Sequence, residues 1–104
     1  MREELDNIVK MHDLIGRTFE SFWCTYDRYL EEEPTESKTI GFYGRDSINA
    51  ELYGYAFFVT KELDFDCIKV YIEICLKAEN IRCGEYWCVY SLDGKEYDDY
   101  FVID

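Results

Sequence analysis

The chain has 104 residues, enough for one domain with a modest hydrophobic core and too few for two. Hydrophobic residues make up 48% of it and there is a single proline, which argues against a disordered chain. The formal net charge of -12 argues against nucleic acids and anionic membranes as direct partners, because phosphate contacts need clustered lysine and arginine.

A helical pattern of large side chains covers residues 5–30. Their spacing alternates between three and four residues, and the members are Leu5, Ile8, His12, Ile15, Phe19, Phe22, Tyr26 and Tyr29. The opposite face holds acid–base pairs in the favourable order, such as Asp6 with Lys10. We predict a long N-terminal helix within residues 1–33. A continuous helix is the first choice, because the acid–base pairing continues across Gly16; a break near Gly16 is the alternative, since glycine costs about 1 kcal/mol inside a helix.

The predicted helix ends at three consecutive glutamates, Glu31, Glu32 and Glu33, directly before Pro34. Proline biases the residue before it away from helical conformation. Negative charge at a helix C-terminus opposes the helix dipole. These glutamates are therefore either a solvated helix end or a surface that cations of a partner neutralise.

From residue 38 to residue 104 the pattern changes to the alternation of strands, which predicts an antiparallel meander. The predicted strands cover residues 39–43, 49–60, 67–77, 85–92 and 95–103. In the second of these strands, Glu51, Tyr53 and Tyr55 fall on one side. The predicted fold is a single α+β domain, residues 1–104, in which the helix packs on a four- to five-stranded antiparallel sheet ending in a β-hairpin.

The last two strands flank Asp93-Gly94, a dipeptide preferred in two-residue type I′ turns. Zipping outward from this turn pairs Tyr90 with Tyr97, Cys88 with Asp99, Trp87 with Tyr100, and Tyr86 with Phe101. Asp98 and Asp99 are adjacent, so they point to opposite faces of the strand and cannot clamp one ion together.

Motifs for catalysis are missing from the sequence. The single histidine, His12, lies in the helical stripe, where a structural role is favoured over a catalytic one. Asp64 and Asp66 could share a face, but the glycine and spacing of a calcium-binding EF-hand do not follow them. We predict that the protein is not an enzyme and that it uses no metal or other cofactor.

The five cysteines are an odd number and lack the paired spacing of zinc sites. They are typical of free thiols in a reducing compartment, and the N-terminal residues show no signal-peptide or membrane-span pattern. We therefore expect a cytoplasmic protein. Cys24 lies on the charged side of the helix and should be the most modifiable thiol.

Tyrosine is unusually frequent, with ten copies, and several tyrosines adjoin carboxylates. Tyrosine is favoured at protein interfaces, and carboxylates around it select for arginine and lysine on a partner. For any single tyrosine, a place at the edge of the core is the simpler interpretation. As a set, the predicted partner-binding residues are Glu31, Glu32, Glu33, Glu51, Tyr53, Tyr55, Glu96, Tyr97, Asp98, Asp99 and Tyr100.

In size, charge and lack of catalytic motifs, the chain resembles phage-encoded anti-CRISPR proteins and other DNA mimics. It also resembles the acidic immunity proteins that neutralise bacterial nuclease toxins. Residues 85–104 contain six acids and one base, so their carboxylates can stand where phosphates would. The resemblance implies an inhibitor in a bacterial cytoplasm, monomeric or dimeric, that blocks a basic nucleic-acid-binding effector or nuclease and binds neither nucleic acid nor membrane itself.

Two alternatives come from other functional classes. The helix-on-sheet outline is similar to that of cystatins, and a helix cupped by a curved sheet can enclose an aromatic cavity. The first alternative is therefore a cystatin-like or nuclear-transport-factor-like domain that binds a small molecule. The second is an acidic subunit that oligomerises through the outer face of its sheet.

Overall fold

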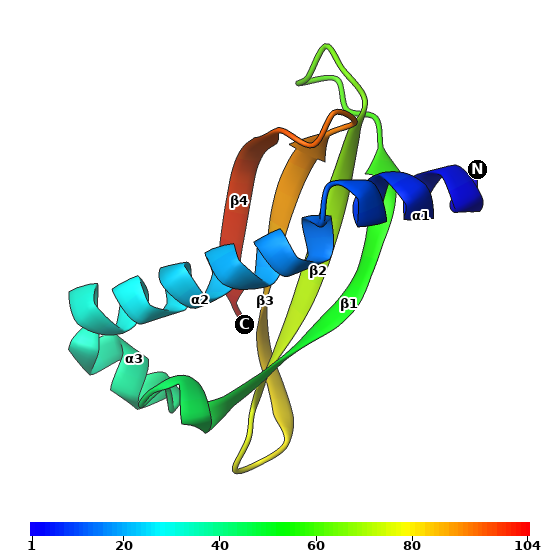
Figure 1. The fold of residues 1–104 in the computed structure, drawn as a ribbon. Helices are drawn as coiled ribbons and strands as arrows, with labels where there is room; N and C mark the ends of the chain where they lie inside the picture. The colour runs from blue at the N-terminus through cyan, green and yellow to red at the C-terminus, as the bar shows by residue number, and fades with distance from the viewer.

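The computed structural model describes all 104 residues and shows three α-helices on one side of a four-stranded antiparallel sheet (Figure 1). The elements are α1 (Arg2–Met11), α2 (Leu14–Glu32), α3 (Pro34–Ile40), a short 3-10 turn η1 (Arg45–Ser47), β1 (Ile48–Phe58), β2 (Cys67–Leu76), β3 (Ile81–Ser91) and β4 (Glu96–Ile103). The strands follow one another in the order β1-β2-β3-β4. The predicted α+β class and antiparallel meander are confirmed.

The predicted N-terminal helix is broken at Asp13, just ahead of the glycine that the sequence pointed to. Asp13 adopts a left-handed conformation with φ 49° and ψ 46°, which separates α1 from α2. Gly16 continues α2 without interruption. The break places His12 against the turn between β3 and β4, where a Cβ on Gly94 would lie 2.6 Å from the imidazole ring.

The strand predicted at residues 39–43 is wrong, because residues 34–40 form α3. Pro34 occupies the first turn of this helix, where its fixed φ is compatible and its missing N–H is not needed. Gly41 ends the helix with φ 108°. The sheet therefore begins at Ile48, later than the predicted residue 38.

A β-bulge in β1 changes which of its side chains share a face. The register between β1 and β2 shifts between Leu52 and Gly54. Glu51 therefore lies on the side turned away from the helices, whereas Tyr55 lies on the helix side and donates a 2.5 Å hydrogen bond to Asp6. The predicted common face of these residues is wrong, because the bulge inserts one residue into the alternation.

The β3–β4 hairpin is present, but its turn is not type I′. That turn needs positive φ at both central residues, and only Gly94 has it, at 88°. Three predicted pairs, Cys88–Asp99, Trp87–Tyr100 and Tyr86–Phe101, are confirmed. Tyr90 pairs with Glu96 instead of Tyr97, because the register shifts next to the turn.

The core fills the space between α2 and the sheet with aromatic and aliphatic side chains. Phe22, Tyr26, Tyr86 and Tyr90 are all 0% exposed. Two of these tyrosine hydroxyls have partners inside the protein, since Tyr26 donates to Gly44 O at 2.6 Å and the Tyr90 hydroxyl lies 2.8 Å from the Thr18 hydroxyl. The aromatic side chains thus occupy the volume that a small-molecule cavity under the helix would need.

Candidate functional site

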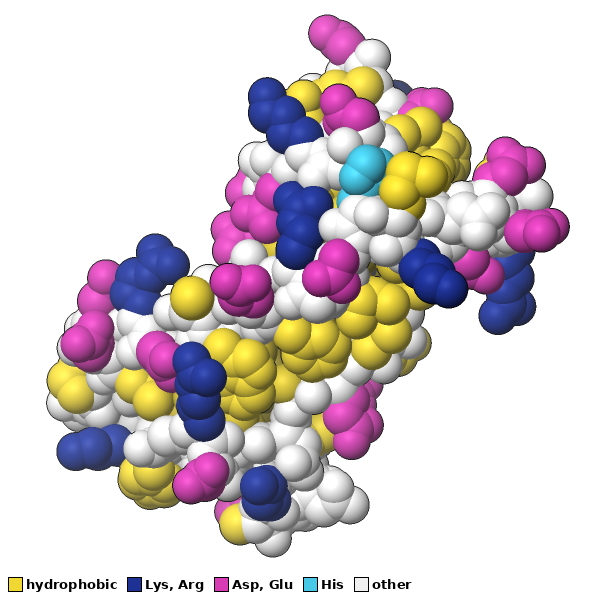
Figure 2. All heavy atoms as spheres, in the orientation of Figure 1, with side chains coloured by type: hydrophobic (Ala, Val, Ile, Leu, Met, Phe, Trp, Pro, Cys, Tyr) yellow, Lys and Arg dark blue, Asp and Glu magenta, His cyan; other side chains and the backbone are white.

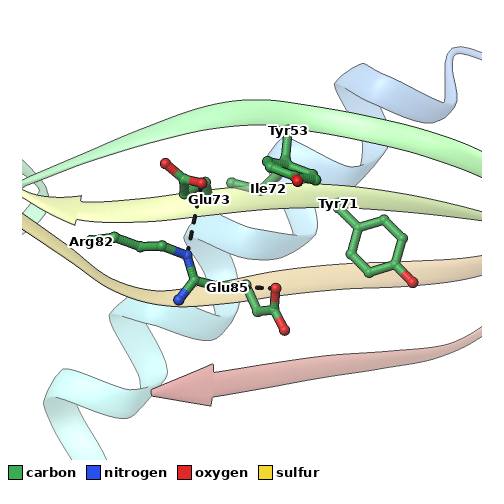
Figure 3. Close-up of a pocket in the computed structure, with 6 residues that line it drawn as sticks. All are labelled: Tyr53, Tyr71, Ile72, Glu73, Arg82 and Glu85. Atoms are coloured by element: carbon green, nitrogen blue, oxygen red, sulfur yellow. Dashed lines mark hydrogen bonds and ion pairs between the residues drawn. The ribbon is translucent and has the colours of Figure 1, made fainter. Parts of the chain in front are cut away.

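The face of the sheet turned away from the helices is not covered by any other element. Figure 3 shows Tyr71, Glu73 and Glu85 projecting from this side, with the helices behind the strands. We call it the outer face; by strand register it carries Glu51, Lys69, Tyr71, Glu73, Glu85, Trp87, Asp98 and Tyr100. By contrast, the helix-covered side mixes acidic and basic side chains, with hydrophobic side chains along the flank of α2 (Figure 2).

Three glutamates on the outer face lie side by side across three strands. Glu51 of β1 is the register partner of Glu73 of β2, and Glu73 is the partner of Glu85 of β3. We call this set the carboxylate row. Like charges directly opposite each other destabilise a sheet, by about 0.2–1 kcal/mol for a pair.

Arg82 supplies the only nearby cation that pairs with the carboxylate row. Its Nε lies 3.7 Å from Glu73 and its Nη2 lies 3.1 Å from Glu85 (Figure 3). Its Nη1 pairs with Asp104. Glu51 forms no ion pair. The row therefore keeps an excess of negative charge that is greatest at its β1 end.

Next to the carboxylate row, three aromatic rings lie across β2, β3 and β4. Tyr71 and Trp87 have ring centroids 5.6 Å apart, and Trp87 stacks on Tyr100 at 5.0 Å. We call them the aromatic row. The Tyr100 hydroxyl donates a hydrogen bond to Asp98 at 3.0 Å. This hydrogen bond is the main reason that the pKa of Tyr100 is raised. Burial, followed by the charge of Glu85, raises the pKa of Tyr71.

The aromatic row separates two hollows in the outer face. The first has a volume of about 420 Å³ and is lined by Tyr53, Tyr71, Ile72, Glu73, Arg82 and Glu85 (Figure 3). The second, of about 370 Å³, lies toward the β1–β2 loop and includes Trp87, Tyr100 and Asp98. In the second hollow, the Lys69 ammonium lies 3.6 Å from the centre of the Phe58 ring, so a cation is already present there.

The structure divides the predicted partner-binding residues of β4 between the two faces. Asp98 and Tyr100 lie on the outer face. Asp99 lies on the helix side, where it accepts a 2.6 Å hydrogen bond from the Tyr86 hydroxyl. Glu96 also turns toward α2, with its carboxylate 3.4 Å from the Ser21 hydroxyl. Tyr97 leaves the alternation and packs on Phe65, with ring centroids 4.4 Å apart.

The other predicted residues are similarly divided. Glu51 and Tyr53 border the outer face, and Tyr53 is 76% exposed. Tyr55 is held on the helix side by Asp6. Glu31, Glu32 and Glu33 are exposed at the end of α2, in the helix layer, and do not join the outer face.

Sequence reasoning missed four members of the two rows: Tyr71, Glu73, Glu85 and Trp87. A signal for two of them was present, because the alternation of residues 67–77 already placed Tyr71 and Glu73 on the polar face of one strand. Their alignment with β1 and β3 depends on strand register, which the alternation does not specify.

His12 and the cysteines are the other potentially reactive side chains that the sequence singles out. His12 ends α1 and is half-buried against Gly94. No group of three or more His, Cys, Asp or Glu side chains is placed to hold a metal ion. Burial raises the pKa of Cys83 and of Cys88 to about 11 each, whereas Cys24 is exposed, as expected.

No helix has the length and apolar character needed to cross a membrane. No protein-family model, no curated protein and no solved structure matches this chain. A functional assignment therefore rests on the geometry and charge of the outer face.

Proposed function

We propose that this protein is an inhibitor that binds a basic, nucleic-acid-handling protein through the outer face of its sheet. The observation that carries the proposal is the carboxylate row, Glu51–Glu73–Glu85, lying beside the aromatic row, Tyr71–Trp87–Tyr100, on an uncovered face. Aligned like charges reduce the stability of the free domain. A cationic partner reverses this cost, because each carboxylate then gains a charge-assisted hydrogen bond.

The spacing of the carboxylates suits a partner that normally binds phosphates. Adjacent strands lie about 4.8 Å apart, so the row presents negative charge at intervals of that order. One strand of duplex DNA presents a phosphate about every 3.4 Å along its axis. Asp98 adds a further carboxylate to the outer face on the other side of the aromatic row, in the second hollow.

The aromatic row supplies the contact area that a charged surface alone lacks. Tyrosine and tryptophan are enriched among the interface residues that contribute most to binding energy. Tyr100 and Tyr53 are 43% and 76% exposed, and both border a hollow in the outer face.

An immunity protein against a nuclease toxin would be one case of this proposal, because its target has the same chemistry. The exposed free thiol of Cys24 suits a reducing cytoplasm, which we include in the proposal.

A competition assay tests the proposal. A labelled basic DNA-binding peptide containing both arginine and lysine is bound to duplex DNA, and the domain is added while fluorescence anisotropy is followed. We expect the wild-type domain to release the DNA from the peptide. The double variant Glu51→Gln/Glu73→Gln should need at least about tenfold more protein for the same release, a loss of about 1.4 kcal/mol in binding.

The matched control is Glu31→Gln/Glu32→Gln, which removes the same charge from the end of α2. It should change the competition by less than about twofold, because exposed charges farther than a Debye length from the contact are screened. If the two double variants lose equal activity, only net charge matters and the outer face is not the binding site.

A further inference from the structure

The two rows lie close enough for one side chain to contact both. Tyr71 and Glu73 are two residues apart on β2, as are Trp87 and Glu85 on β3. At about 3.4 Å per residue, the rows are separated by about 7 Å. A side chain lying between them would meet an aromatic surface on one side and carboxylates on the other.

This inference rests on the proposed function. We propose that the partner places an arginine side chain, and not a lysine, on the surface between these two rows, which we call the seat. The seat is the β1 end of the first hollow, where Tyr53, Tyr71 and Glu73 line it and Glu51 is the register partner of Glu73. A guanidinium group is planar, stacks on aromatic rings and donates two parallel hydrogen bonds to a carboxylate. An ammonium group is a point charge that cannot do both at once.

The molecule already holds one of its own arginines in this way. The Arg45 guanidinium lies 5.1 Å from the centre of the Trp23 ring. It also donates from Nε and Nη2 to the two carboxylate oxygens of Asp27, at 3.2 and 2.7 Å. An arrangement of ring, guanidinium and carboxylate therefore already occurs in this fold, between α2 and η1.

Arg82 shows that a guanidinium also fits the carboxylate row itself. It contacts Glu73 and Glu85 from the β3 side of the first hollow. Glu51 lies on the other side of Glu73 and has no cation of its own. The unfilled position is therefore the one beside Glu51, next to the exposed ring of Tyr53.

Paired peptides test the choice between arginine and lysine. Two peptides have the same length and charge, with arginine in one and lysine in the other at the same positions between glycine and serine. The protein used in these titrations is the Trp23→Phe variant. Its only tryptophan is Trp87 of the aromatic row, so a change in tryptophan fluorescence reports binding at that row. We expect the arginine peptide to bind at least about tenfold more tightly than the lysine peptide.

The outcomes separate this inference from the proposed function. Equal affinity for the two peptides overturns the arginine inference and leaves the cation-binding face in place. If neither peptide binds, the proposed function itself is wrong. A preference for the lysine peptide also overturns the inference.

A variant pair tests whether stacking causes the preference. Tyr53→Leu should reduce the arginine peptide's advantage while leaving lysine affinity unchanged, and it should not affect folding because Tyr53 is 76% exposed. Tyr71→Leu should do the same, with its folding checked by thermal melt. Tyr43, which is 72% exposed and lies just after α3, provides the matched control Tyr43→Leu. Equal losses for both peptides in Tyr53→Leu would show that stacking on arginine is not the cause.

Discussion

The Tyr86 hydroxyl donates a 2.6 Å hydrogen bond to the Asp99 carboxylate, which separates the roles of two adjacent aspartates. Tyr86 is 0% exposed, so its hydroxyl depends on this acceptor. Asp98 lies on the opposite face, where it accepts from Tyr100. The sequence presents Asp98 and Asp99 as one acidic pair, but the structure makes one a surface group and the other a support of the core.

Asp99→Ala should therefore destabilise the fold without weakening partner binding. It leaves the buried Tyr86 hydroxyl without an acceptor, which costs about 1–3 kcal/mol. Asp98→Ala should have the reverse effect, with nearly unchanged stability and weaker binding to a basic peptide. Thermal melts and peptide titrations on both variants measure the two effects. A loss of binding in well-folded Asp99→Ala would contradict this division.

Glu51→Gln should stabilise the free domain while weakening its binding to a cationic partner. The substitution removes one of two like charges that are directly opposite each other, a gain of about 0.2–1 kcal/mol. Urea unfolding at low salt should show the increase in the free energy of unfolding, and added salt should reduce it. Glu20→Gln, on the exposed side of α2, is the control and should change neither property. A destabilised Glu51→Gln would show that the carboxylate row is not under repulsion.

The domain should lose stability at alkaline pH, starting near pH 9. Burial raises the pKa values of Cys83 and Cys88 from 9.0 to about 11. Between these values the folded state binds more protons than the unfolded state, so the free energy of unfolding falls as pH rises. Burial also raises the pKa values of Tyr86 and Tyr90, which adds to the loss.

Melting temperatures measured under reducing conditions from neutral pH to about pH 11 check this expectation. Cys88→Ala should melt at a lower temperature at neutral pH but show a shallower decline above pH 9, the ordinary pKa of its thiol. A melting temperature that stays constant across this range would mean that the thiols ionise freely in the folded state.

Gly94→Ala should destabilise the β3–β4 turn and the helix break that packs on it. Gly94 has φ 88°, and a Cβ there would lie 2.6 Å from the His12 ring. Left-handed strain in a residue other than glycine costs about 1–3 kcal/mol. Gly44→Ala is the control, because Gly44 has an extended backbone and a Cβ there meets nothing within 4 Å. Equal melting temperatures for the two variants would contradict the packing of His12 on the turn.

The sequence by itself determined the fold class, the meander and most of the last hairpin's pairing. Alternation in β2 and β3 is a local property of each strand, and pairs such as Trp87–Tyr100 lie close to their turn. The structure predicted from the sequence was wrong where two local patterns favour different conformations for the same residues. Pro34 and Gly41 made residues 34–40 a helix instead of a loop and strand. The bulge in β1 separated Glu51 from Tyr55.

Only the tertiary structure decided which side chains meet on the outer face. Glu51, Glu73 and Glu85 are far apart in the sequence, and no pattern within any one strand shows that the three lie side by side. Alternation assigns a residue to a face but does not say which residue of the next strand lies opposite, and a shift of one residue would turn that strand's side chains to the other face. Turns and bulges set that register, and the packing of α2 decided which face stayed uncovered.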